Sequence, residues 1–136
     1  MIQFNQPTLS EFYLVNNTVY LNIYDKFNTS LAEYSPLWIA TSQLTKKTKA
    51  WTPSTTWTNK ERYVEMNTVT TTGSELPDSG RIKLGTTDYP LGFYDLTIYQ
   101  NTSNSNLDPA GLSVLYTGIL NLSTTSGKGP VKYNEY

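Results

Sequence analysis

The sequence predicts an all-β protein: an antiparallel, immunoglobulin-like β-sandwich of about 7–9 strands with no significant helix. Apolar residues recur at every second position in several short segments, which places one set on each face of a strand. No apolar stripe with the spacing i, i+3, i+4 persists for two turns, so no helix is expected. Turn-forming residues separate these segments at spacings of about 8–14 residues, as in antiparallel sandwiches.

The most regular stretch, Asp88–Leu122, predicts two long strands joined by a polar turn. In the first strand Tyr94, Leu96 and Ile98 occupy alternate positions. The connection Asn101–Gly111 is dense in Asn, Ser, Asp, Pro and Gly, which favour turns and left-handed backbone. We therefore expect a hairpin with a long tip, corresponding to the F and G strands of a sandwich.

The second strand of this hairpin is expected to carry alternate residues from Val114 to Leu122 on one face. Gly118 falls within that set and indicates either a bulge or a close backbone approach. Leu115 and Ile119 lie on the other face, so the strand should be covered on much of both faces.

Tyr94 stands near the start of the first strand, two residues before Leu96. In immunoglobulin domains a tyrosine corner has this place: the hydroxyl bonds to upstream backbone, and a core Cys follows two residues later. Here Leu96 would hold the position of the Cys. Two explanations remain open, a tyrosine corner or an amphipathic strand that happens to contain Tyr.

Earlier in the chain, residues 1–10 predict an N-terminal arm or a short edge strand. Glu11–Val15 and Val19–Tyr24 predict a hairpin turning at Asn16-Asn17-Thr18, because Asn tolerates the positive φ of tight turns. Asp25–Ser35 has turn-like composition.

Leu37–Gln43 predicts the next strand, and Thr48–Thr52 predicts its return. Trp38 is expected in the core, where sandwich domains often bury a strand-C tryptophan. The lysines within Lys46–Lys49 could bind phosphate or a membrane, but so short a run favours a solvated hairpin tip.

Trp51 and Trp57 bracket a polar, loop-like segment. If exposed, they could stack on sugar rings or dock a partner; the favoured alternative is that each tucks into the sandwich rim. After them, Arg62–Val69 predicts a strand with one polar face. Arg81–Leu84 predicts a short edge strand with its two cations outward.

Composition excludes several functions. The chain has 136 residues, enough for a single sandwich domain over residues 1–136. It has no Cys and no His, which removes disulfides, thiolate zinc sites and histidine-dependent catalysis. The carboxylates follow no motif, and Asn104–Asp108, the best local calcium candidate, should instead cap its own backbone. We therefore predict no enzyme and no catalytic, cofactor-binding or metal-binding residues.

The charge pattern also limits the partners. A net charge of −1 gives no basic field for nucleic acid. No apolar run is long enough to span a membrane. The first residues lack the basic and apolar regions of a secretion signal.

Several motifs resemble those of a known group of proteins. They are Arg62-Tyr63, Gly80-Arg81-Ile82-Lys83-Leu84, Gly92-Phe93-Tyr94, Ile98-Tyr99-Gln100-Asn101-Thr102-Ser103, Asn106-Leu107-Asp108-Pro109 and Tyr133-Asn134-Glu135-Tyr136. This pattern resembles small, mostly uncharacterised virion structural proteins of tailed bacteriophages, typical of phages of Bacteroidetes-like and marine hosts. The likeness covers most of the chain and is firm over about Gly80–Tyr136.

The resemblance implies a virion component, made in the host cytoplasm, in the head shell, the neck or the tail. Its partners would be other virion proteins and copies of itself, giving an oligomer in the assembled particle. The N-terminal arm and a C-terminal strand, residues 131–136, could add to neighbouring sheet edges. The expected assembly contacts are Val131, Tyr133, Tyr136, Asn106, Leu107 and Asp108. The alternative is a carbohydrate- or receptor-binding sandwich that uses Trp51, Trp57 or Tyr99.

Overall fold

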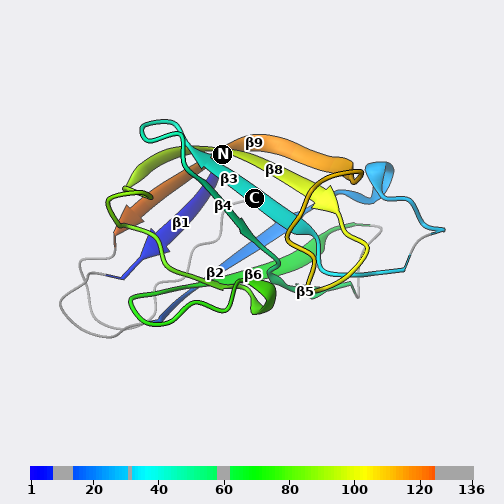
Figure 1. Ribbon diagram of the computed structural model, residues 1–136. Coiled ribbons are helices and arrows are strands. Elements are labelled where there is room, and N and C mark those ends of the chain that lie inside the picture. Colours follow the sequence, from blue (N-terminus) through cyan, green and yellow to red (C-terminus); the bar gives the residue numbers. More distant parts are fainter. Residues whose placement is uncertain (8–13, 31, 58–61, 125–136) are drawn as a thin grey trace.

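The computed structural model describes residues 1–7, 14–30, 32–57 and 62–124, which form two stacked sheets (Figure 1). Helical structure in these residues is limited to two single 3-10 turns. The elements in chain order are β1 (Ile2–Gln6), β2 (Leu14–Leu21), η1 (Tyr24–Lys26), β3 (Leu37–Ser42), β4 (Thr48–Trp51), β5 (Ser54–Thr56), β6 (Val64–Thr71), η2 (Pro77–Ser79), β7 (Arg81–Ile82), β8 (Gly92–Gln100) and β9 (Ser113–Thr124).

The strand pairing is that of a β-sandwich. One sheet has the order β1-β9-β8-β3-β4; the other has the order β2-β6-β5, with β7 also paired to β6. With β2, β6 and β5 as strands B, E and D, and β3, β8 and β9 as C, F and G, neighbours pair as in the immunoglobulin fold. The prediction of an all-β sandwich is confirmed. The prediction that it is wholly antiparallel is wrong at two places, because β1 pairs with β9 and β6 with β7 in parallel.

Three aromatic rings from the five-stranded sheet fill the middle of the core. The ring centroids of Phe4, Trp38 and Trp51 lie 5.7 to 6.2 Å apart, and all three side chains are fully buried. Both indole N–H groups reach β6 in the opposite sheet: Trp38 Nε1 donates to Met66 Sδ at 3.3 Å, and Trp51 Nε1 to Thr68 Oγ1 at 2.9 Å. The two tryptophans therefore link the sheets by hydrogen bonds as well as by packing.

This arrangement decides the two tryptophan predictions. Trp38 lies in the core as expected. Trp51 as an exposed aromatic is wrong, because the register places it directly opposite Trp38 on the inward face of β4. The favoured alternative, a buried Trp51, is the one found.

The predicted hairpin at Asn16-Asn17-Thr18 is also wrong. β2 runs through these residues without a turn and pairs with β6 from Leu14 to Leu21. The Asn pair was expected to supply positive φ, but Asn17 points inward and is 3% exposed. Its side-chain amide finds partners inside the sandwich, which removes the cost of burying it in a strand.

Those partners join β1 to the second sheet. Asn17 Oδ1 accepts a hydrogen bond from the backbone N–H of Asn5 at 2.8 Å, and Asn17 Nδ2 lies 3.3 Å from the Asn5 carbonyl oxygen. The Thr70 hydroxyl on β6 also donates to that carbonyl. The side chains of Asn17 and Thr70 thus satisfy the backbone N–H and C=O of Asn5 on the edge of β1 that β9 does not cover.

The N-terminal residues accordingly form an edge strand. Ile2 and Phe4 are core residues, so the predicted arm is wrong for β1. Residues 8–10 lie outside the described residues, as do residues 131–136 with the assembly contacts predicted there.

β9 contains a bulge at Leu115, whereas the sequence suggested one at Gly118. Ile98 faces Tyr116 and Tyr99 faces Val114, so Leu115 is the extra residue. Leu115 therefore turns into the core at 2% exposure, and Val114, expected to share a covered face with Leu120 and Leu122, is 43% exposed. Neither a bulge nor a close backbone approach is found at Gly118; a side chain covers it instead, since a Cβ there would lie 2.5 Å from the Tyr116 hydroxyl.

Tyr94 has the geometry of a tyrosine corner. Its ring is buried, and its hydroxyl donates to the Pro90 carbonyl oxygen, four residues upstream, at 2.7 Å. Leu96 occupies the core position that follows two residues later. Burial, and to a smaller extent Tyr89, raises the pKa of Tyr94 well above the ordinary tyrosine value. The hydroxyl therefore stays protonated and remains a donor.

Replacing Asn17 by Ala should lower the free energy of unfolding by about 2 kcal/mol or more, because the Asn5 N–H is left buried without a partner. Asn16→Ala, at the exposed neighbouring position, should change it by less than about 0.5 kcal/mol. Urea denaturation of the two variants measures both values. Equal losses would show that Asn17 has no special role.

Replacing Tyr94 by Phe should lower the free energy of unfolding by about 1–2 kcal/mol at neutral pH, the contribution of a buried hydrogen bond. Tyr99→Phe, on the opposite face of the same strand, is the matched control and should lower the free energy of unfolding by less.

The pH dependence gives Tyr94 a second test. An unfolded tyrosine ionises near about pH 10, whereas folded Tyr94 keeps its proton, so its stabilising contribution is complete below that pH and falls above it. Tyr94→Phe should therefore lose less stability than the wild type between about pH 9 and about pH 11. If the free energy of unfolding fell equally with pH in the wild type and in Tyr94→Phe, the buried, protonated state of Tyr94 would be contradicted.

Candidate functional site

The two ends of the sandwich carry different surfaces. The connections β2–β3 (residues 22–36) and β8–β9 (residues 101–112), which we call the loop end, lie together at the right in Figure 1. The β3–β4 turn and the segment before β8 lie at the opposite end of the five-stranded sheet. The register explains this, since β3 and β8 are antiparallel and each starts where the other ends.

Amide side chains lock the loop end together. Gln100, the last residue of β8, exchanges two hydrogen bonds with the backbone of Asn28, at 2.8 and 3.0 Å. Asn104 Oδ1 accepts from the Ser35 backbone N–H at 2.8 Å, and the Asn104 carbonyl accepts from the Thr52 hydroxyl at 2.9 Å. The β8–β9 loop is thereby fixed to both the β2–β3 loop and the β4–β5 turn.

The tip of the β8–β9 loop is braced from within. Asn106 Nδ2 donates to Asn101 Oδ1 and to the Asp108 carbonyl, both at 2.9 Å. Asp108 Oδ1 in turn accepts from the Ala110 backbone N–H at 3.0 Å. Asn and Asp therefore cap their own backbone here, as expected for such a turn. Leu107, between two held residues, is 37% exposed at a fixed position.

The predicted assembly residues of this tip divide into two kinds. Asn106 is half-buried and shapes the loop, whereas Leu107 and Asp108 face solvent. Tyr34, in the β2–β3 loop, is also 37% exposed. A surface of Asn, Ser and Thr with a few large apolar or aromatic side chains has the composition of antibody binding loops, which occupy the same end of their sandwich.

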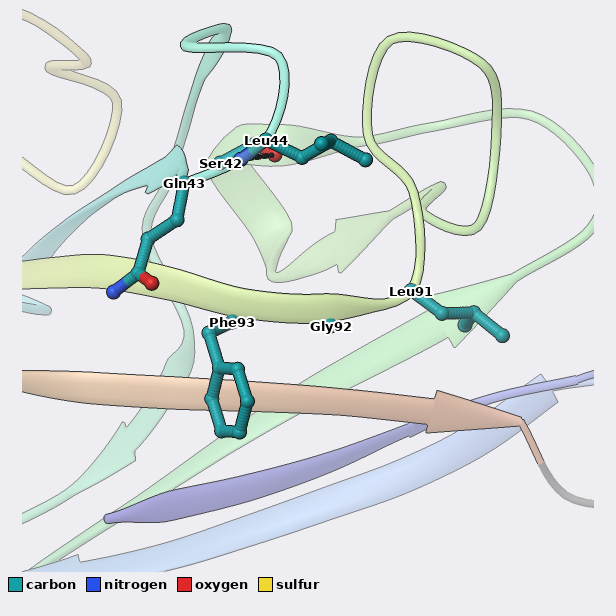
Figure 2. A pocket seen from close by; sticks show the side chains of 6 residues that line it. All are labelled: Ser42, Gln43, Leu44, Leu91, Gly92 and Phe93. Atoms are coloured by element: carbon teal, nitrogen blue, oxygen red, sulfur yellow. Dashed lines mark hydrogen bonds between the residues drawn. The ribbon is translucent and has the colours of Figure 1, made fainter.

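The opposite end has an apolar surface that the sequence did not reveal. Leu44 is 78% exposed, Leu91 46% and Phe93 48%. Together with Ser42, Gln43 and Gly92 these residues line a depression of about 250 Å³ (Figure 2). We call Leu44, Leu91 and Phe93 the apolar corner. Clustered exposed apolar side chains of this kind mark contact surfaces in soluble proteins.

The lysines predicted to form a solvated hairpin tip border this corner. Lys46 has a φ of 62°, completes the β3–β4 turn and is exposed, as is Lys47. Lys49 differs, because it pairs with Glu75 and lies 4.4 Å from the ring centroid of Tyr89. Among the described residues Lys46 and Lys47 have no carboxylate partner. The corner therefore combines exposed apolar area with two unpaired cations.

The three aromatic residues named as alternative sugar contacts lie in different parts of the sandwich. Trp51 is buried, and Trp57 packs its half-buried ring against Phe27 at a centroid distance of 5.0 Å. Tyr99 is half-buried on the outer face of the five-stranded sheet. The three rings do not share one exposed face.

Within the described residues, no group of three or more His, Cys, Asp or Glu side chains could hold a metal ion. No helix in that part of the chain is long and apolar enough to cross a membrane.

Comparisons with known proteins gave no relative. Protein-family models, curated proteins and solved structures were searched, and none of them matches this chain.

The cross-bracing of the loop end predicts a specific change in dynamics. Asn104→Ala removes the acceptor of the Ser35 amide, so exchange of that amide with solvent should accelerate roughly tenfold, as for the loss of one hydrogen bond. Ser105→Ala, at the next exposed position, should leave the Ser35 rate unchanged. Amide hydrogen exchange measured by NMR distinguishes the two variants, and an unaltered rate in Asn104→Ala would show that the loops are not coupled.

Proposed function

We propose that this chain is a non-enzymatic structural protein of a tailed-bacteriophage virion, associated with the capsid, neck or tail, and that its loop end docks onto a neighbouring virion protein. The virion assignment draws its support from the sequence resemblance, and the docking part from the loop end. Fold alone does not specify a function, so the argument depends on the surface.

The observation that carries the docking proposal is that the loop end is rigid yet presents Leu107. Gln100 and Asn104 fix the loops, and Asn106 fixes the tip. Binding through a preorganised loop costs little further conformational entropy. The side chains of Gln100, Asn104 and Asn106 bond to other loop residues, so they shape a binding surface and supply no reactive group for catalysis.

A receptor-binding module is the second candidate. It is favoured by the likeness of the loop end in composition and position to antibody binding loops. A receptor- or sugar-binding domain should bind its ligand as an isolated protein, whereas an assembly protein should not. Probing a glycan array with the purified chain separates these two candidates.

The virion proposal predicts that Leu107→Asp reduces incorporation of this protein into particles several-fold, because a charge would replace the apolar contact at the tip. Ser54→Asp adds the same charge at an exposed position of β5 and should be incorporated normally. Quantitative mass spectrometry of purified particles, normalised to the major capsid protein, measures both. Wild-type protein missing from particles would refute the virion role, and normal incorporation of Leu107→Asp would refute docking through the tip.

The same measurement distinguishes positions in the particle. Hundreds of copies would indicate a shell or decoration protein, and about a dozen or fewer would indicate the neck or tail, following the symmetry of closed rings.

A further inference from the structure

The loop end and the apolar corner have complementary chemistry. At the tip of the loop end, exposed Leu107 is followed directly by exposed Asp108. At the corner, the depression bordered by Leu44 and Leu91 lies beside the exposed Lys46-Lys47 pair. One end of the sandwich thus presents an apolar side chain next to an anion, and the other end presents an apolar depression next to cations.

The other charges near the two surfaces are unequal. The described charged residues of the loop end are Asp25, Lys26, Glu33 and Asp108, three carboxylates and one lysine. Near the corner, Lys46 and Lys47 are balanced by Asp88 and by Asp95, whose Oδ1 accepts from Gln43 Nε2 at 3.0 Å. The attraction between two copies is therefore local: Asp108 at the tip would lie beside Lys46 and Lys47, which form no ion pair within the described residues.

The size of the depression favours a side chain as its occupant. Its volume of about 250 Å³ lies below the roughly 300–1,000 Å³ of pockets that enclose small molecules. A depression of this size, rimmed by leucines, suits an apolar anchor from another polypeptide chain, which is the usual centre of a protein interface.

From these observations we infer that copies of this chain associate head to tail, with Leu107 of one copy inserted at the apolar corner of the next and Asp108 beside Lys46 and Lys47. The inference rests on the proposed function and names a second copy as the neighbour that the loop end contacts. Because the two surfaces lie at opposite ends of the sandwich, the contact is heterologous and leaves one free surface at each end of the pair. Repetition then gives a row of domains; the nine residues of β8 alone span roughly 30 Å.

The contact is small and should be weak between free molecules. Interfaces well below about 1,000 Å² form transient complexes unless several act together. In a particle, where neighbours are held at high effective concentration, the same contact becomes stable.

The test uses two variants that each destroy one surface, Leu44→Asp at the corner and Leu107→Asp at the tip. Sedimentation velocity over a concentration series, up to about millimolar, follows the association of weak complexes. The wild type should form progressively larger species as its concentration rises. Each variant alone should remain monomeric, and Ser54→Asp should behave as the wild type.

The decisive sample is an equimolar mixture of the two variants. Leu44→Asp keeps an intact tip and Leu107→Asp an intact corner, so the mixture should form a 1:1 dimer and nothing larger. Lys46→Glu with Lys47→Glu, introduced into the Leu107→Asp partner, should abolish that dimer. Circular dichroism spectra and thermal melting of each variant establish that the fold is intact.

Three results would overturn the inference. These are a wild type that stays monomeric throughout the series, single variants that associate as the wild type does, and a mixture that stays monomeric. If the wild type is monomeric while Leu107→Asp still fails to enter particles, head-to-tail association is refuted and the proposed docking stands. The loop end would then bind a different virion protein.

Discussion

Two buried indole N–H groups hold the two sheets of this protein at a fixed distance and register. The chain has no Cys and therefore no disulfide between its sheets. Trp38 and Trp51 lie side by side in one sheet, and each donates to a residue of β6 in the other. A buried N–H without an acceptor is costly, so the sheets cannot slide without breaking these bonds. The ring of Phe4 stacks on Trp38 and lies tilted against Trp51, which adds apolar contact around these bonds.

The outer edges of the five-stranded sheet are partly covered, which leaves the ends of the sandwich for contact with other molecules. On the outer edge of β1, the backbone N–H and C=O of Asn5 bond to Asn17 and Thr70. The outer edge of β4 is covered where the Tyr89 hydroxyl donates to the Thr48 carbonyl and where the N–H that follows the strand donates to Pro77. Covered edges discourage strand-to-strand addition. Among the described residues of the five-stranded sheet and its connections, the large exposed apolar side chains are Leu107 at the loop end, the three residues of the apolar corner, Val114 in β9 and Met1 before β1.

The candidate site could be predicted only in part. The turn composition of Asn101–Gly111 correctly indicated a self-capped tip, and Leu107 and Asp108 are exposed there. The partners that fix the loops, such as Gln100 to Asn28, are 72 residues apart in sequence. The apolar corner joins Leu44 to residues of the β7–β8 connection and β8, and no local pattern relates them. An exposed Trp51 was considered because its sequence neighbours are polar, whereas its cross-strand partner is Trp38.

The sequence by itself determined the fold class, most strands and the division of β6 and β8 into two faces, because alternation along a strand is local information. It also determined that Tyr94 and Leu96 would share the core face. Tertiary structure alone decided that β1 pairs in parallel with β9, that Asn17 lies inside a continuous strand, and that a bulge turns Leu115 inward. The physical reason is the same in each case: the free energy of a buried polar group, or of a residue beside a bulge, depends on partners that only the folded chain brings near.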